Sequence, residues 1–477
     1  MEEVERTMPS ARRRPPDARR SRNQSDSNFA CSIIAAIIAI AGGIGFYFKR
    51  ARSNVAAVDL NSPPSPPPIL GALEKNVYER ELVTRKVEYS SILKEHTGFY
   101  FNVSRRLSPG RALGFVSPWS IRGEEVAWRF GSKLTHLSPL MYGVDSKGTL
   151  VYHVDDPKRW LDGLREGLTC PGCPPPARLV PQVSLQGLDF ASFFTDKEGD
   201  ADGAREERSG RLLFALLQQA VTLNLDGLIL DAHTYLARLD QSTRQTVAPR
   251  VHIFVQLLAQ QLSVQAQESL DSAGASASAP GKSCCTEGLF LEVPPHPQLF
   301  SPAQFKQLSS SLGGVILQTT NYSAVRGQAG PTAPLKWMRD SLGALAAGLL
   351  EEDDEGSDGA FVEDDGGRRA MEAALPKLMA TLPLLGWDFV LPDGPSNPIG
   401  GIEYLQLLEK HKPKRLDWHA EAAEHVFAYR DGEELRHSVY YPSLKTMAER
   451  LGMLRSLGVG VAVYELGIGL DYFWDLL

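Results

Sequence analysis

From residue 112 onward, short apolar segments alternate with amphipathic ones, and this alternation limits the fold more than any other feature of the chain. Residues 211–223, 250–262 and 443–457 have the apolar spacing of amphipathic helices. The strands that we expect are residues 113–119, 134–139, 179–184, 227–231, 289–293, 314–319, 384–388 and 459–465. Eight alternating units favour an α/β fold, a parallel (β/α)8 TIM barrel, over an open sheet. We expect a small α+β insertion between the seventh and eighth strands.

The composition is that of a globular protein. The chain has 477 residues, of which 43% are hydrophobic and 22% charged, enough for one large barrel with additions. Its formal net charge is −7. A nucleic-acid-binding protein is expected to carry a basic face, so this charge argues against nucleic acid as a partner.

The N-terminal part predicts a membrane anchor. Phe29–Phe48 carries no charge and matches the roughly 20 residues that cross a bilayer. An arginine-rich stretch precedes it, which favours a cytosolic N-terminus. We therefore expect a disordered cytosolic tail over residues 1–28, a transmembrane signal anchor over residues 29–48, and a barrel in the endomembrane lumen or outside the cell. A cleaved signal peptide, giving a secreted or lysosomal protein, is the alternative.

The remaining organisation follows from local composition. We expect a Pro-rich linker and a lead-in helix over residues 49–95, then the barrel domain over residues 110–477. Residues 195–208, 263–288 and 351–367 are low in complexity and predict flexible surface loops. The last of these is acidic, which suits either a basic partner or calcium, or only a solvated loop.

Cysteines and glycosylation motifs bear on the compartment. The cysteines outside the expected anchor form two neighbouring pairs, Cys170 with Cys173 and Cys284 with Cys285. Disulfides, free thiols and a zinc site are open alternatives for them. Asn-x-Ser motifs begin at Asn102, which is accessible in a lumenal domain, and at Asn321, which we place in a core strand.

The run Leu225–His233 (LDGLILDAH) contains the residues that bear most directly on a possible catalytic or binding function. Residues two apart in a strand share one face, so Ile229, Asp231 and His233 are expected to lie on the same face. The run resembles the signature strand of family 18 glycoside hydrolases, Asp-Gly-x-Asp-x-Asp-x-Glu, and the resemblance implies that this face points into the barrel. A carboxylate there must be hydrogen-bonded or paired, so we expect Asp231 to contact a ligand.

Further stretches carry the same resemblance over most of the chain. They are residues 113–119, 133–139, 330–337 and 457–473. They resemble most the chitinase-domain-containing, or stabilin-interacting chitinase-like, branch. That branch lacks the usual catalytic glutamate, and its members are described as binding saccharides. The resemblance therefore implies binding of chitin-type glycans.

The chain departs from the family pattern where the family performs its chemistry. The resemblance implies that the terminal glutamate of the signature protonates the leaving group and that the aspartate before it orients the substrate's acetamido group. Here His233 replaces the glutamate and Ile229 the first inner aspartate. Thr320 and Asn321 stand for a tyrosine and an aspartate, and Tyr464 for a tryptophan. These changes together predict a membrane-anchored, non-catalytic protein.

Sugar-binding residues are expected at the barrel mouth, where aromatic faces and polar groups gather. The aromatic candidates are Trp119, Tyr142, Trp387 and Tyr464, and the polar ones are Asp231, His233, Gln318, Asn321, Asp388 and Glu465, with Trp418 flanking the cleft. We expect no cofactor and no metal. Two alternatives stay open: an active glycoside hydrolase whose proton donor is Asp231, Glu465 or His233, and a scaffold for protein partners in the endomembrane system.

Overall fold

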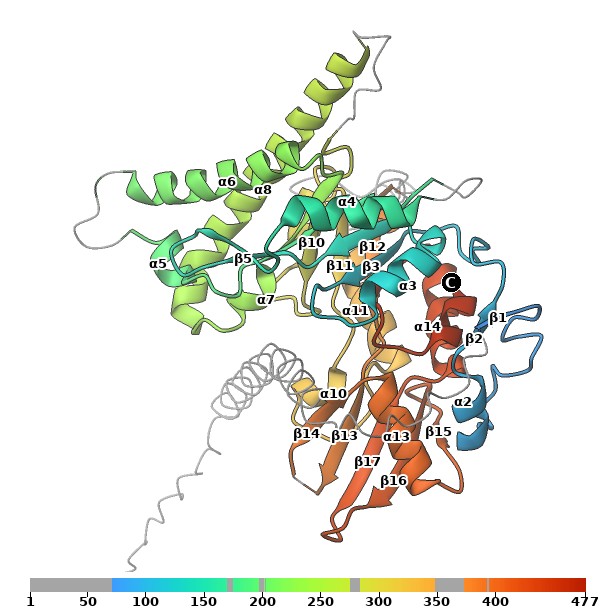
Figure 1. The fold of residues 1–477 in the computed structure, drawn as a ribbon. Coiled ribbons are helices and arrows are strands. Elements are labelled where there is room, and N and C mark those ends of the chain that lie inside the picture. Colours follow the sequence, from blue (N-terminus) through green and yellow to red (C-terminus); the bar gives the residue numbers. More distant parts are fainter. Residues whose placement is uncertain are drawn as a thin grey trace, which may run out of the picture.

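The fold is centred on a ring of parallel strands. The computed structural model describes residues 71–169, 175–196, 201, 203–274, 284–347, 373–392 and 394–477. Eight parallel strand segments of these ranges form the ring, and helices pack around it (Figure 1). They are β3 (Ala112–Val116), β4 (His136–Pro139), β7 (Arg178–Leu179) continued by β8 (Gln182–Ser184), β9 (Gly227–Asp231), β10 (Gly288–Val293), β11 (Gly314–Leu317), β12 (Leu378–Pro383) and β18 (Gly460–Tyr464). The expected α/β fold is confirmed.

The third strand of the ring is interrupted at Pro181, which has no N–H to donate. On one side of this strand, Val180 N donates to Leu137 O of β4 at 3.0 Å. On the other side, Ile229 N of β9 donates to Pro181 O at 2.9 Å. Since β18 also pairs with β3, these bonds close the ring.

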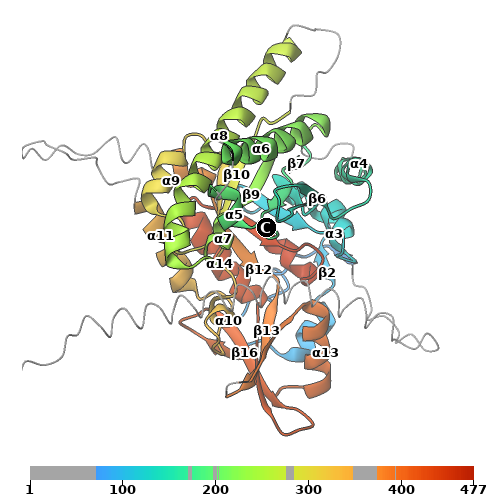
Figure 2. The same cartoon turned by 90° about the vertical axis from the view of Figure 1, so that its left-hand side faces the viewer.

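Helices connect and cover the strands, as Figure 2 shows from the side. They are α3 (Gly123–Phe130), α4 (Pro157–Leu168), α5 (Phe190–Phe194), α6 (Ala204–Thr222), α7 (His233–Leu236), α8 (Gln241–Gly274), α9 (Pro302–Leu308), α10 (Tyr322–Val325), α11 (Leu335–Ala347) and α14 (Leu444–Ser456), with 3-10 turns η1 (Gly131–Lys133), η2 (Leu375–Lys377) and η3 (Asp471–Leu476). Two segments that we expected to be loops are partly helical, because α6 begins at Ala204 and α8 runs to Gly274.

The barrel interior is filled by apolar side chains from every strand of the ring. This apolar layer contains Leu113, Phe115, Leu140, Val180, Ile229, Phe290, Ile316, Met379 and Ala462. In a TIM barrel, inward side chains of alternate strands stack in layers, and these residues fill the corresponding space here. At about 25 cal/mol per Å² of apolar surface removed from water, this layer is a major source of barrel stability.

The insertion between the seventh and eighth barrel strands is present. It comprises β13 (Gly386–Leu391), β14 (Ser396–Ile399), α13 (Gly401–His411), β15 (Asp417–His419), β16 (Glu424–Arg430) and β17 (Arg436–Tyr441), and its strands form one antiparallel sheet. This insertion sheet lies beside the barrel, below it in Figure 1. A buried ion pair of 3.0 Å between Glu424 of the sheet and Arg450 of α14 connects the two parts.

Our expected seventh strand, residues 384–388, is wrong. The seventh barrel strand is β12, and residues 386–391 form β13 of the insertion sheet. Residues 378–391 read as one apolar run that contains two strands, with Gly386 starting the second. A side chain at Gly386 would place its Cβ 2.4 Å from Tyr440 O, so the close approach of β17 requires glycine there.

The segments before and beside the ring complete the described chain. Strands β1 (Gly71–Leu73) and β2 (Gly98–Tyr100) form a small parallel sheet, and the lead-in helix is only α2 (Tyr89–Glu95). Strands β5 (Tyr142–Val144) and β6 (Leu150–Tyr152) form a hairpin that pairs with β8. Val77 N donates to Asp475 Oδ2 at 3.0 Å, which ties the lead-in to the end of the chain.

Several predictions concern residues outside the described ranges. They are the tail, the anchor over Phe29–Phe48, the linker to residue 70, Cys170, Cys173 and the acidic stretch 351–367. Within the ranges given above, no helix combines the length and apolarity needed to span a membrane. Cys284 and Cys285 are both buried free thiols.

Candidate functional site

A second layer of side chains, this one polar, lies above the apolar layer. Its members follow the apolar residues by two positions on the same strands, so they also point inward. This polar layer consists of Ser117, Gln182, Asp231, Glu292, Gln318, Thr381 and Tyr464. It lies at the carboxyl ends of the strands, the end at which TIM barrels place their sites.

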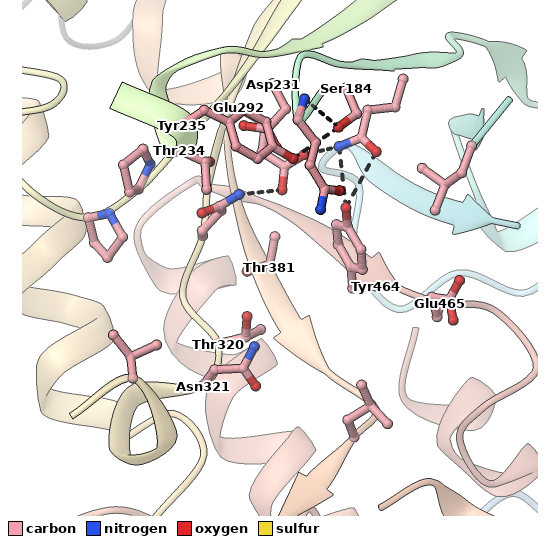
Figure 3. A pocket seen from close by; sticks show the side chains of 18 of the residues that line it. Ser184, Asp231, Thr234, Tyr235, Glu292, Thr320, Asn321, Thr381, Tyr464 and Glu465 are labelled. Atoms are coloured by element: carbon pink, nitrogen blue, oxygen red, sulfur yellow. Dashed lines mark hydrogen bonds between the residues drawn. The ribbon is translucent and has the colours of Figure 1, made fainter. Parts of the chain in front are cut away.

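A pocket of about 430 Å³ opens above this layer (Figure 3). It contains every member of the polar layer except Ser117. Of the residues that we expected at the site, those that line it are Trp119, Tyr142, Asp231, Gln318, Asn321, Tyr464 and Glu465. The sequence therefore identified a minority of the residues that line the pocket, and it carried no information on how the side chains contact one another.

His233 does not line this pocket, contrary to our expectation. Strand β9 ends at Asp231, and His233 is the first residue of α7, so the alternation that would point it inward stops before it. Its ring packs edge-on against Phe300, with the centroids 5.0 Å apart, and only 1% of the residue is exposed. Burial lowers the pKa of His233 to about 3, so at neutral pH the imidazole is neutral and cannot act as an imidazolium acid.

The two ends of the signature run have different roles. Asp226 Oδ2 accepts a hydrogen bond from Leu179 N at 2.7 Å. A Cβ at Gly227 would lie 2.4 Å from Gly288 O, so β9 and β10 can approach only with glycine there. Asp226 and Gly227 therefore hold strands together, whereas Asp231 faces the pocket.

Asp231 and Glu292 stand side by side on the pocket floor. They are register partners on the parallel strands β9 and β10, and 5% and 1% of the two residues are exposed. Burial raises the pKa of Asp231 to about 6, with Thr234 and Tyr235 opposing it in part. Burial, and then the charge of Asp231, raise the pKa of Glu292 to about 8. At neutral pH this carboxyl pair therefore holds about one proton.

Polar groups from other strands surround the carboxyl pair. The side-chain amides of Gln182 and Gln318 donate to Glu292, the latter at 2.8 Å. Gln182 also lies 3.3 Å from Tyr464 Oη, and Ser184 Oγ lies 2.9 Å from Tyr235 Oη. These contacts join four strands of the ring and the short helix α7 in one network, drawn in Figure 3.

Sequence reasoning missed Glu292 as a site residue, although a signal was present. Within β10 it is the one charged residue of an otherwise apolar strand, two positions after the inward-facing Phe290. The same rule that selected Asp231 selects Glu292, because a carboxyl group on an inner face needs polar partners.

Trp119 and Glu465 form another wall of the pocket. Trp119 is 38% exposed, and its ring lies edge-on to that of His153 at 5.8 Å. Burial raises the pKa of Glu465 to about 7, and interactions with Ser117 and Trp119 oppose this in part. Glu465 follows β18 with a left-handed backbone (φ 57°), which ends the strand at the pocket.

Asn321 belongs to the pocket and not, as we had expected, to a core strand. Strand β11 ends at Leu317, and Asn321 precedes α10 with φ 61°. Its Oδ1 accepts a hydrogen bond of 3.0 Å from Trp387 Nε1. Two further aromatic residues that our site prediction omitted, Tyr322 and Trp337, line the same wall with ring centroids 5.0 Å apart.

Trp387, Asp388 and Trp418 do not line this pocket. All three belong to the insertion sheet, and our expected seventh strand had placed Trp387 and Asp388 in the barrel instead. Trp387 is buried against Phe389, and it supports the pocket only through Asn321. Asp388 accepts hydrogen bonds from Tyr429 and His437 within the sheet, and Trp418 packs on His425 at 4.8 Å.

The donor groups of the polar layer are not arranged for a metal ion. Among the residues that the structure describes, no group of three or more His, Cys, Asp or Glu side chains is placed to hold one. The polar layer instead offers carboxyl, amide and hydroxyl groups around a pocket with aromatic walls. Such an arrangement suits an uncharged or cationic polar ligand with apolar faces.

Comparisons with known proteins concern the fold and one short stretch of sequence. No family model matches the chain. The uncharacterized glycosylase YvbX of Bacillus subtilis (strain 168) is 26% identical over 102 residues, which are 21% of this chain and 30% of that protein. The chain thus matches less than a third of that relative's length.

Solved structures resemble most of the described fold. The chitinase of Chromobacterium violaceum ATCC 12472 is 15% identical with a TM-score of 0.53, covering 77% of this chain and 97% of that one. The family 18 chitinase of Cycas revoluta, solved with (GlcNAc)4, is 15% identical with a TM-score of 0.52 (76% and 97%). The spore cortex-lytic enzyme SleL of Bacillus cereus is 12% identical with a TM-score of 0.50 (78% and 74%). The chain therefore has the fold of family 18 chitinases and related glycosylases.

Proposed function

We propose that this chain is a non-catalytic chitinase-like protein of glycoside hydrolase family 18, related to the stabilin-interacting branch, and that it binds a chitin-type oligosaccharide. His233, at the position of the family's proton donor, packs on Phe300 outside the pocket. Asp231, two residues earlier, lines the pocket, and its buried Oδ1 has no hydrogen-bond partner among the described residues. The chain has thus lost the family's acid at the site and kept a ligand-facing polar floor.

The pocket has properties that suit a sugar. Its volume of about 430 Å³ is within the usual range of small-ligand sites. Trp119 offers an exposed aromatic face for stacking, and the amides and carboxyls below offer hydrogen bonds to hydroxyl groups. The Cycas chitinase with a similar fold was solved with (GlcNAc)4, which supports a saccharide of this class.

Binding and turnover measured on the same purified full-length protein test the proposal. We expect saturable binding of the N-acetylglucosamine tetramer by calorimetry and no cleavage of a fluorogenic chitobioside. The absence of binding to a broad glycan panel would contradict the proposal and favour a scaffold for protein partners.

Glycoside hydrolysis with another donor is the second candidate. It draws support from Glu465 and Asp231, whose pKa values of about 7 and 6 suit proton transfer near neutral pH. Turnover that disappears in Asp231→Ala or Glu465→Gln would replace the binding proposal with this one. We expect His233→Glu to restore no turnover, because that position faces Phe300 and not the pocket.

We also propose that Phe29–Phe48 anchors the protein, with the barrel in the endomembrane lumen or outside the cell. The support is the uncharged length of this segment and the arginines before it. Asn102 is exposed, as a glycosylation site must be. We expect a shift in gel mobility that a glycosidase removes and that Asn102→Gln abolishes. An unmodified Asn102 in a eukaryotic membrane fraction would count against this topology.

A further inference from the structure

The floor of the pocket contains two buried acidic groups side by side. Asp231 and Glu292 are register partners on adjacent strands, and both are at least nine-tenths buried. In the part of the chain that the structure describes, neither carboxyl group has a basic side chain within ion-pair distance. Buried carboxylates usually have such a partner, because an uncompensated charge in the interior is costly.

The basic side chains that line the pocket are engaged elsewhere or are uncharged. Arg238 stacks on the Tyr235 ring at 4.6 Å, and its charge lowers the pKa of Asp231 only in part. Arg326 lies over Tyr322 at 3.7 Å. Burial lowers the pKa of His153 and of His296, so both imidazoles are mainly neutral at neutral pH.

Asp231 offers a specific acceptor for a ligand. Asp231 lines the pocket, and its buried Oδ1 makes no hydrogen bond to any described residue. Glu292, next to it, already receives two amide hydrogen bonds from Gln182 and Gln318. The unfilled acceptor and the neighbouring carboxyl group together define a place for one group that donates several hydrogen bonds and carries positive charge.

We propose that the pocket floor binds the protonated amino group of an amino sugar, so that the preferred ligand is a glucosamine oligomer with free amino groups and not its N-acetylated form. This inference rests on the proposed function, because it assumes a saccharide in the pocket. An ammonium group has three N–H donors and compensates the carboxyl pair. A neutral acetamido group or hydroxyl leaves the charge of the pair uncompensated.

The carboxyl pair gives the inference a second, independent signature. Before binding, the pair holds about one proton at neutral pH, because burial raises both pKa values and the charge of Asp231 raises that of Glu292 further. An ammonium group stabilises the ionised form of both carboxyl groups, so binding of a sugar whose amino group is already protonated in solution should expel a proton from the pair. A neutral sugar should expel none. The released proton is measured from the dependence of the binding enthalpy on the ionisation enthalpy of the buffer.

The inference is tested on the full-length protein with three sugar tetramers: the glucosamine tetramer, the N-acetylglucosamine tetramer and cellotetraose. These tetramers differ only in the group on the second carbon of each ring. At neutral pH we expect the glucosamine tetramer to bind about tenfold more tightly than either of the others. Its binding should release a proton. In Asp231→Asn and Glu292→Gln, we expect both the preference and the proton release to be lost.

Glu166→Gln is the matched control, because it removes one negative charge from the exposed face of α4, outside the pocket. This variant should keep the preference for the glucosamine tetramer. That result would show that the preference arises from the pocket and not from a general attraction of a cationic sugar to an acidic protein. Circular dichroism confirms that each variant is folded, and the proton release of the unmodified protein tests the inference without any variant.

Each outcome has one meaning. Equal or tighter binding of the N-acetylated tetramer overturns the inference and leaves the proposed function standing. A preference for glucosamine that persists in Asp231→Asn and Glu292→Gln also overturns it, because the pair would not be the cause. Binding of none of the three tetramers contradicts the proposed function itself.

Discussion

The two layers inside the barrel come from the same strands and differ by two residues in sequence, yet they are opposite in character. The lower layer, with Ile229 and Phe290, is apolar and almost fully buried. The upper layer, with Asp231 and Glu292, is polar and lines the pocket. Because each strand supplies both layers, stability and ligand contact are separated along the strand and not between regions of the fold.

The positions at which this chain differs from the family pattern fall in different layers. Ile229, in place of the first inner aspartate, belongs to the apolar layer, so this substitution favours packing over polarity. Asp231 keeps its polarity in the upper layer. His233 would belong to a third layer, but the strand ends before it. His233 therefore lies at the start of α7, outside the pocket, and packs against Phe300.

Phe290→Ala should break the lower layer with the largest effect. The ring is fully buried and meets the His136 ring at 5.2 Å. Removing it should lower the free energy of unfolding by about 3–5 kcal/mol, measured by urea denaturation. The affinity for the glycan should change little, because the ring does not line the pocket. A lost affinity with unchanged stability would show that the layers are not separate.

The upper layer should make stability depend on pH. The folded pKa of Glu292 is about 8, above the value of about 4.3 for an unfolded glutamate. The folded state therefore holds the proton of Glu292 more tightly than the unfolded state does. This proton binding stabilises the folded state fully below the unfolded pKa, and the stabilisation is lost as pH rises through about 8. We expect a decrease on the order of a few kcal/mol in the free energy of unfolding across this window.

Asp231 acts in the same direction, because its raised pKa means that its stabilising effect is lost as pH rises through about 6. Glu292→Gln should therefore reduce the slope of the profile from about pH 4.3 to about pH 8, leaving only the contribution of Asp231, which ends near pH 6. Urea denaturation at several pH values measures both proteins. Parallel profiles for the variant and the unmodified protein would contradict the assigned pKa shift of Glu292.

The sequence predicted the strands better than it predicted the site, and particular residues show why. Alternation within one strand is local, so β9 and β10 could be placed from a few residues each. The contact between Gln182 and Glu292 joins residues 110 apart, which no local pattern records. Trp387 was assigned to the barrel because an unbroken apolar run hides the boundary between β12 and β13. His233 was assigned inward because the family pattern extends the strand.

Trp119→Ala should test the wall of the pocket, with a smaller effect than the changes within the barrel. Trp119 is 38% exposed, so we expect its loss to change stability by less than about 1 kcal/mol. If a sugar stacks on it, the dissociation constant should rise about tenfold by calorimetry. Trp128→Ala is the control, because Trp128 is 44% exposed on α3 and does not line the pocket. Equal effects of both variants would argue against stacking on Trp119.

Tyr464 joins the two layers, and the smallest expected effect concerns its hydroxyl group. Its ring lies 4.3 Å from that of Phe115 in the apolar layer, while Oη lies 3.3 Å from Gln182 Nε2 in the polar layer. Tyr464→Phe should lower the free energy of unfolding by about 1 kcal/mol or less, because it removes one long hydrogen bond and keeps the packing. Tyr464→Leu, which also replaces the ring, should cost more. Urea denaturation measures the free energy of unfolding of both variants. If both lower it equally, the hydroxyl group in the polar layer contributes more to stability than we expect, and the packing of the ring contributes less.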